Sequence, residues 1–247
     1  MSFWLRKERA EHMTWWQRHD RSSQIITQQV KGKKEAIAWV IGLGGWKRNR
    51  EFEPPIQRFF RDLEQRLGRW TGNEFTPIHP TEHVEVAEAL NKGKTQFQVH
   101  AIEVDTQSHE MAKTDLIGRR IPTRQIQNGI LKEVIKPVPE HIANRIVFHG
   151  PGPAGNVFNT LPRKRPDVVT VFNLPGYYSE QEQTRLAEHL AGSLKPGGLI
   201  LTNVRGQEEF VERLDAKLEK HVVELNQFGE PRIVAFRKPE QFAPASQ

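Results

Sequence analysis

Polar side chains stand at the ends of two apolar segments, where they could contact a ligand. Glu103 and Asp105 close the segment FQVHAIEVD, and Asn173 lies near the end of the segment VVTVFNL. Both segments have the composition of buried strands. In open α/β sheets, ligands bind outside the carboxyl ends of the strands. The three residues are therefore candidate ligand-binding residues.

A second candidate is the pattern H-x-x-E-H formed by His79, Glu82 and His83. In zinc proteases this pattern requires both histidines on one helix face and a further carboxylate. Thr81 is the expected N-cap of a helix, and Pro80 places His79 before that helix begins. We therefore expect no metal site. The chain also has no cysteine, which excludes disulfides, thiolate zinc sites and a cysteine nucleophile.

Two glycine clusters could form cofactor loops. Gly150-Pro-Gly-Pro-Ala-Gly155 matches G-x-G-x-x-G, but Pro162 and Pro166 follow where a helix is required, so we interpret it as a loop over the adenine side of a pocket. Gly42-Leu-Gly44-Gly45 follows an apolar run, AIAWVIGL, which could be a buried strand or a short helix. No strand with an acidic end follows closely, so neither cluster is taken as a dinucleotide fingerprint.

Strands and helices alternate from Glu74 onward. The expected strands are residues 74–78, 97–104, 144–149, 168–174, 199–204, 222–228 and 233–237, and the expected helices are residues 81–90, 107–114, 123–135, 180–194 and 208–219. The alternation predicts an α/β fold with a mostly parallel sheet covered on both faces and closed by an antiparallel C-terminal hairpin. We expect a mainly helical region over residues 1–70, the α/β domain over 71–240, and a flexible tail over 241–247.

The positive charge of the chain is concentrated in residues 1–70. This region has 15 Lys and Arg against 8 Asp and Glu, whereas the remainder has 21 against 22, and all six tryptophans lie in it. The asymmetry indicates either an acidic partner, such as nucleic acid or a membrane surface, or a solvated helical face. The sequence lacks an apolar run long enough for a transmembrane helix and has no signal peptide, so we expect a cytoplasmic protein.

The stretch from Asp167 to Val204 resembles the second half of class I S-adenosylmethionine (SAM) methyltransferases, with the turn Lys195-Pro-Gly-Gly198 before a buried strand. The closest resemblance is to the chemotaxis-receptor methyltransferases, through the acidic strand end at Glu103 and through Asn173 with Tyr177 and Tyr178. The resemblance implies a Rossmann-like methyltransferase fold. It also implies that Glu103 binds the ribose hydroxyls of SAM and that Asn173 lies beside the methionine part or the substrate.

The resemblance also requires a glycine-rich loop after the first strand. At that position, after the expected strand 74–78, the chain has the segment Thr76 to His83, which contains two prolines and no glycine. His79 and Glu82 of this segment, with Gly150, then join Glu103, Asp105 and Asn173 as candidate cofactor-binding residues. Two functions remain open: a SAM-dependent methyltransferase with a protein substrate or partner, or an inactive methyltransferase-fold protein that serves as a scaffold.

Overall fold

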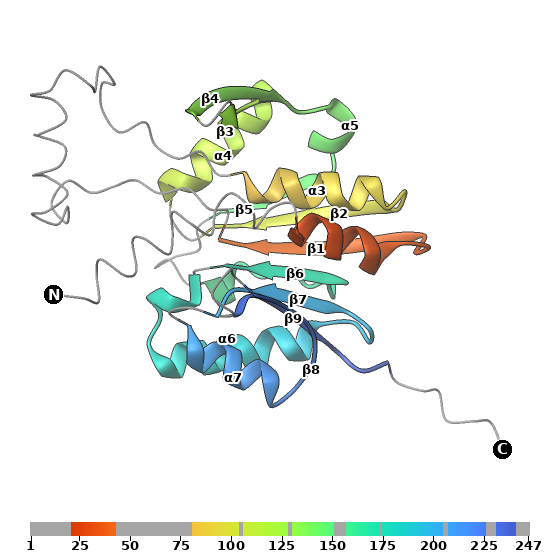
Figure 1. The fold of residues 1–247 in the computed structure, drawn as a ribbon, viewed down its shortest axis with the longest axis vertical. Helices are drawn as coiled ribbons and strands as arrows, with labels where there is room; N and C mark the ends of the chain where they lie inside the picture. Colours follow the sequence, from red (N-terminus) through yellow and green to blue (C-terminus); the bar gives the residue numbers. More distant parts are fainter. Residues whose placement is uncertain are drawn as a thin grey trace, which may run out of the picture.

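The protein is built around one seven-stranded sheet, shown in Figure 1. The computed structural model describes residues 21–42, 81–103, 106–127, 130–150, 157–172, 174–204, 207–225 and 231–240. The strands of the sheet are β1 (Glu35–Ile41), β2 (Gln96–Ile102), β5 (Ile146–His149), β6 (Val168–Val171), β7 (Leu199–Thr202), β8 (Glu219–Leu225) and β9 (Pro231–Arg237). Their order across the sheet is β5-β2-β1-β6-β7-β9-β8. All neighbours are parallel except the pairs that involve β9.

The strand β1 corrects the predicted division of the chain at residue 70. This strand lies inside the basic region 1–70, yet it pairs with β2 on one side and with β6 on the other. Its residues alternate between the two faces, and all of them except Glu35 and Ile37 are buried, as expected for a central strand. The helix over residues 21–30, which packs beside it, also belongs to this layer. In the described part, the α/β domain therefore begins well before residue 71.

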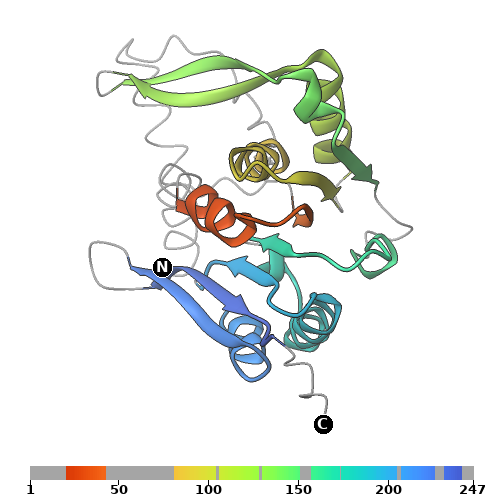
Figure 2. The same ribbon diagram turned by 90° about the vertical axis from the view of Figure 1, so that its right-hand side faces the viewer.

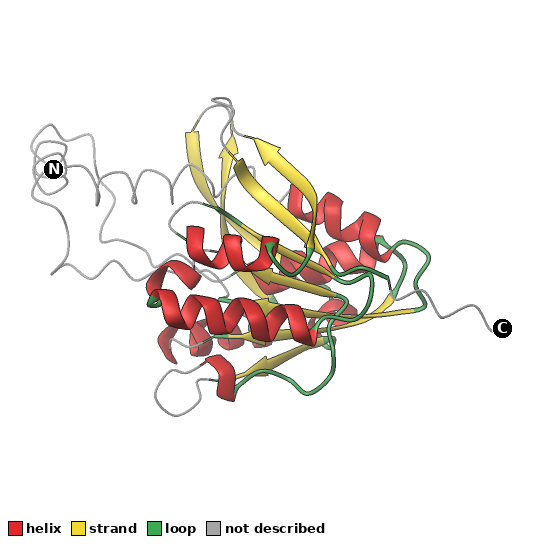
Figure 3. Ribbon diagram, turned by 90° about the horizontal axis from the view of Figure 1, so that it is seen from below, coloured by secondary structure: helices red, strands yellow, loops and turns green. Residues whose placement is uncertain are grey.

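Helices cover both faces of the sheet (Figure 2). On one face, the helix over residues 21–30 packs with α3 (Glu82–Lys92), α4 (Thr106–Gly118) and α5 (Glu140–Ala143) around a core that includes Val40 and Val99. On the other, α6 (Glu180–Ser193) and α7 (Glu208–Asp215) pack on a core that includes Trp39 and Val169. Alternate residues of each strand thus enter two different cores, and Figure 3 shows red helices on either side of the yellow strands.

A separate hairpin replaces the helix predicted over residues 123–135. The strands β3 (Arg120–Gln127) and β4 (Ile130–Pro137) pair antiparallel along their whole length and form a two-stranded sheet of their own. Their sequences, RIPTRQIQ and ILKEVIKP, are rich in β-branched residues, and those residues favour strands over helices. The helical prediction was therefore wrong, because spacing alone does not separate a short helix from a pair of strands.

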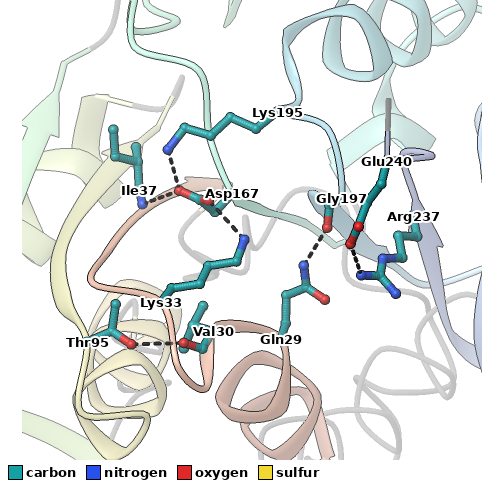
Figure 4. A network of polar contacts seen from close by, with 10 residues as sticks. All are labelled: Gln29, Val30, Lys33, Ile37, Thr95, Asp167, Lys195, Gly197, Arg237 and Glu240. Carbon is teal, nitrogen blue, oxygen red and sulfur yellow. Dashed lines mark hydrogen bonds and ion pairs between the residues drawn. The ribbon is translucent and has the colours of Figure 1, made fainter. Parts of the chain in front are cut away.

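A buried carboxylate, Asp167, accepts several hydrogen bonds at the amino ends of the parallel strands (Figure 4). Its side chain accepts hydrogen bonds from Lys33 Nζ at 3.0 Å, from Lys195 Nζ at 2.7 Å and from the Ile37 backbone N–H at 2.9 Å. Burial acts to raise the pKa of this carboxyl, but the Lys195, Ile37 and Lys33 donors outweigh burial and hold the pKa below its ordinary range. Asp167 thus joins β1 to the start of β6 and to the turn before β7.

The Lys195-Pro-Gly-Gly198 turn requires glycine at two positions, one because of its backbone conformation and the other because no room is left for a side chain. Gly197 has a φ of +70°, and a Cβ placed on Gly198 would lie 2.8 Å from the Lys195 carbonyl oxygen. The backbone N–H of Gly197 donates to the Lys238 carbonyl, and Gln29 donates to the Gly197 carbonyl (Figure 4). The turn therefore ties β7 to the residues after β9 and to the helix over residues 21–30.

The remaining predicted elements are confirmed to within a few residues: α3, α4, α6 and α7, the strands β2, β5, β6 and β7, and the C-terminal β8–β9 hairpin. The predicted strand 74–78 and the expected flexible tail 241–247 lie outside the described residues. Among the helices of the described part, none has the length and hydrophobicity to cross a membrane.

Candidate ligand site at the carboxyl edge of the sheet

The parallel strands all end at the left edge of the sheet in Figure 1. The chain order reverses between β1 and β6, since β2 and β5 lie on one side of β1 and β6 and β7 on the other. Such a reversal leaves a crevice outside the strand ends, where ligands of open α/β sheets bind. The residues that follow β1, β2, β5, β6 and β7 are therefore the candidate site.

Gly42 directly follows β1 and has a φ of +75°, which only glycine adopts without strain. Its N–H donates to the Ile102 carbonyl at 2.9 Å, and a Cβ on this residue would lie 3.3 Å from the Leu174 Cβ. The sequence continues as Leu43-Gly44-Gly45, which lies outside the described residues. The first strand of the sheet thus leads directly into a glycine-rich segment.

The prediction of a glycine-free loop after the first strand is therefore wrong. It rested on taking residues 74–78 as that strand, whereas β1 is residues 35–41. Residues 42–81 separate β1 from α3, so the acidic strand end expected near the glycines is far away in sequence. In the folded protein the glycines and the acidic strand end nevertheless lie close together. The last residue of β1, Ile41, pairs with the last residue of β2, Ile102.

Among the predicted site residues, Glu103 has the position that agrees most clearly with the prediction. It follows the last residue of β2, beside Gly42 at the end of the neighbouring strand β1, and its side chain is buried. A buried carboxylate at a strand end offers strong acceptors to ligand hydroxyls. The position agrees with the role that the resemblance implies.

The other predicted site residues are only partly brought together. Glu82 is buried at the first turn of α3, and Gly150 follows β5, where a Cβ would lie 3.0 Å from His109 Nε2. Both therefore lie at or near strand and helix ends of the candidate edge. Asp105, Asn173 and His79 lie outside the described residues.

Sequence reasoning missed the role of Tyr178 and Gln183 in this edge. The short helix η4 (Leu174–Tyr177) follows β6, and Tyr178 comes directly after it. Gln183 is buried in α6, where its Nε2 donates to the Tyr178 carbonyl at 3.1 Å and its Oε1 accepts from the Phe210 N–H at 3.2 Å. The signal was available, because a glutamine within the apolar face of an amphipathic helix indicates a specific buried partner.

A second polar network closes the end of β7. Thr202 Oγ1 donates to the Val171 carbonyl at 2.7 Å, and Gln207 Nε2 contacts Thr202 Oγ1 at 2.6 Å as well as the backbone carbonyl of Asn203. All three side chains are buried. Side-chain amides on α6 and at the start of α7 thus hold Tyr178 after β6 and Thr202 and Asn203 at the end of β7.

A histidine pair joins the neighbouring strands β2 and β5. His100 Nδ1 and His149 Nε2 are 2.7 Å apart, so one ring donates and the other accepts. Burial, together with the smaller effects of His149 and Lys164, lowers the pKa of His100 to about 4. Burial, together with His109, also lowers the pKa of His149. The pair is therefore neutral at physiological pH.

We predict that His83 makes the protein sensitive to acid. The ring is completely buried against Phe148, and burial lowers its pKa from 6.5 to about 3. Between these pH values only the unfolded chain takes up the proton, so stability falls as the pH decreases. At about 1.4 kcal/mol per pH unit, wild type should lose about 2 kcal/mol between pH 6.5 and pH 5 relative to His83→Leu.

Urea unfolding at the two pH values measures this difference. The control is His141→Leu, because His141 is exposed on α5. A His83→Leu variant that loses as much stability as wild type on acidification would contradict the prediction.

Comparison with known proteins agrees with this fold. No family model matches the sequence, and no curated protein matches it. Magnesium protoporphyrin IX methyltransferase from Synechocystis PCC 6803, in a structure with bound SAM, is similar with a TM-score of 0.51 and 10% identity, covering 93% of this chain and 82% of that chain. The N-methyltransferase NodS from Bradyrhizobium japonicum WM9 has a TM-score of 0.49 and 10% identity, covering 90% of this chain and 87% of that chain.

The protein has the Rossmann-like fold of class I SAM-dependent methyltransferases. The mostly parallel sheet of seven strands with its antiparallel hairpin was predicted from the sequence and is confirmed. At 10% identity the similarity concerns the fold alone. The particular resemblance to chemotaxis-receptor methyltransferases stays a prediction.

Proposed function

We propose that the protein is a SAM-dependent methyltransferase. The observation that supports this most directly is the junction of β1 and β2, where Gly42 with its positive φ begins a Gly-Leu-Gly-Gly segment next to the buried Glu103. Gly42 also ends the strand that borders the reversal of chain order between β1 and β6, and ligands of open α/β sheets bind outside such a point. The two features that we propose for nucleoside binding therefore lie at the ends of neighbouring strands.

The residues present fit the adenosyl cofactor. The glycine segment lets backbone N–H groups approach the ligand closely, and Glu103 supplies acceptors for its ribose hydroxyls. When bound, SAM supplies an electrophilic methyl group on a sulfonium. Methyl transfer depends mainly on the orientation of the acceptor. In this protein, orientation falls to the loops after β6 and β7, which Gln183 and Gln207 hold in place.

Isothermal titration of the full chain with SAM and with S-adenosylhomocysteine tests the proposal. We expect both to bind with micromolar affinity, and we expect Gly42→Val to abolish binding, because a branched side chain is strained at this φ and meets Leu174. The control is Gly192→Ala, at an α6 glycine with open space around it. Failure of the wild type to bind either ligand would overturn the proposal.

The scaffold alternative rested on a glycine-free cofactor loop and on the Trp- and Arg-rich N-terminal region. The first support no longer applies, because β1 leads into Gly42-Leu-Gly44-Gly45, whereas the second is unchanged. If neither cofactor binds, the fold would instead serve as an interaction module, and pull-down with the full chain would identify its partner.

We further propose that the basic region 1–70 contacts an acidic partner or substrate. Its excess of 15 Lys and Arg over 8 Asp and Glu, with all six tryptophans, supports this proposal. If the partner is nucleic acid, affinity for a single-stranded RNA should fall steeply between 50 and 200 mM salt, by a factor of about 300 for about six phosphate contacts. Salt-insensitive or undetectable RNA binding would leave a protein partner or protein substrate as the proposal.

A further inference from the structure

The hydroxyl of Tyr178 is a buried polar group that the fold leaves unused. Its oxygen is inaccessible to solvent and has no hydrogen-bond partner among the described residues. The ring packs on the core that contains Trp39 and Ile41. Buried hydroxyls almost always have a partner, because an unpaired one has lost water and gained nothing in return. Its position therefore requires an explanation.

The surroundings of Tyr178 place it at the end of β1. The helix η4 that precedes it begins at Leu174, whose Cβ would lie 3.3 Å from a Cβ on Gly42. Gly42 in turn is bonded to the Ile102 carbonyl, one residue before Glu103. The loop that carries Tyr178 thus covers the same strand end that the glycine segment and Glu103 flank.

The phenol of Tyr178 is protonated at neutral pH. Burial, together with the smaller effects of the Glu182 and Glu103 carboxylates, raises the pKa of Tyr178 to about 12. The influence of Glu103 agrees with a location close to the ribose-binding carboxylate. A neutral phenol beside carboxylates is a hydrogen-bond donor without an assigned acceptor.

We propose that Tyr178 is a ligand-binding residue, whose hydroxyl donates a hydrogen bond to an oxygen of the ribose that Glu103 also binds. The inference rests on the proposed function, since it requires an adenosyl ligand. Tyr178 and Glu103 then hold the ribose from opposite sides of the β1 end: the loop after β6 supplies the donor, and the end of β2 supplies the acceptor. The unpaired hydroxyl obtains its partner when the ligand binds.

The variant Tyr178→Phe separates this role from a structural one, because it moves stability and binding in opposite directions. Removal of an unpaired buried hydroxyl should leave the ligand-free protein unchanged or raise its melting temperature by about 2–4 °C. Removal of a hydrogen bond to the ligand should weaken S-adenosylhomocysteine binding about 3- to 10-fold. A residue that only packs in the core would not weaken binding while the free protein becomes more stable.

The matched control is Thr170→Val. Thr170 Oγ1 on β6 is likewise buried and without a hydrogen-bond partner in the described part, but the residue lies within the strand, paired with Val40 and Leu201, and not in the loop that follows it. Its replacement by the isosteric valine should also preserve or raise the melting temperature, and it should leave S-adenosylhomocysteine affinity unchanged. Any loss specific to Tyr178→Phe is then due to the position of the hydroxyl.

Methylthioadenosine, which lacks the amino-acid part, shows which part of the ligand the hydroxyl contacts. Equal losses for methylthioadenosine and S-adenosylhomocysteine support the ribose contact, whereas a loss confined to S-adenosylhomocysteine overturns it. If wild type binds and Tyr178→Phe binds equally well, the inference fails and the proposed function stands. If wild type binds neither ligand, both fail together.

Discussion

Replacement of Glu103 by alanine should weaken S-adenosylhomocysteine binding about a hundredfold or more, the largest effect we expect for a single side chain of the site. The carboxylate is buried at the end of β2, next to Gly42. Two hydrogen bonds from ribose hydroxyls to a charged acceptor contribute about 3 kcal/mol together, which corresponds to a factor above 100. Isothermal titration of wild type and variant gives the ratio directly.

The fold of the Glu103→Ala variant should persist, because the residue lies at the edge of the sheet and not within either apolar core. Circular dichroism checks this point. The control is Glu212→Ala, which removes an exposed carboxylate from α7 and should not change affinity. A Glu103→Ala protein that is folded and binds as tightly as wild type would remove Glu103 from the site.

Replacement of Asp167 by alanine should cost about 3–5 kcal/mol of unfolding free energy, because it leaves two lysines and a backbone N–H without their shared acceptor. The carboxylate directly precedes β6, at the end of the strand opposite to the candidate ligand site. Urea unfolding measures this effect. The midpoint urea concentration should decrease, and the slope of unfolding free energy against urea concentration should not change.

The pH dependence of Asp167 has a defined sign. Its pKa in the folded protein is lowered, because the Lys195, Ile37 and Lys33 donors outweigh the burial that acts to raise it. A carboxyl with a lowered folded pKa stabilises the protein fully above its unfolded pKa, and this contribution is lost as the pH falls through the folded value. The difference between wild type and Asp167→Ala should therefore shrink below about pH 4.

The matched control for Asp167 is Asp215→Ala. Asp215 also accepts from a lysine, Lys220, at 2.8 Å, but both side chains are largely exposed. Exposed pairs of this kind contribute about 0–1 kcal/mol, so the control should unfold almost as wild type does. Equal losses for the two variants would show that burial of Asp167 adds nothing to its ion pairs.

The parts of the fold and of the site that could be predicted from the sequence are those indicated by residues close together in the chain. The alternation of apolar strands and amphipathic helices from residue 81 onward correctly predicted the mostly parallel sheet and the C-terminal hairpin. Glu103 was found because an acidic residue follows an apolar run. These features depend on neighbours within about ten residues, so the sequence contains the whole signal.

The β3–β4 hairpin shows where local patterns were insufficient. Residues 123–135 contain apolar residues at spacings that a helix or a strand pair can use, and only the register, in which Thr123 pairs with Val134, distinguishes them. Tyr178 illustrates the same limit. Its sequence neighbours indicate an aromatic pair, whereas its unpaired hydroxyl and its proximity to the charge of Glu103 arise from the packing of η4 against Gly42.

By itself the sequence determined the class of fold, the acidic residue at the end of β2 and the turn before β7. Only the tertiary structure decided which segment is the first strand. The run AIAWVI was compatible with a strand or a helix, and forty residues lie between it and α3. Its pairing with β2 and β6 places Gly42 beside Glu103, because neighbours in a parallel sheet are set by hydrogen bonds across the sheet and not by distance along the chain.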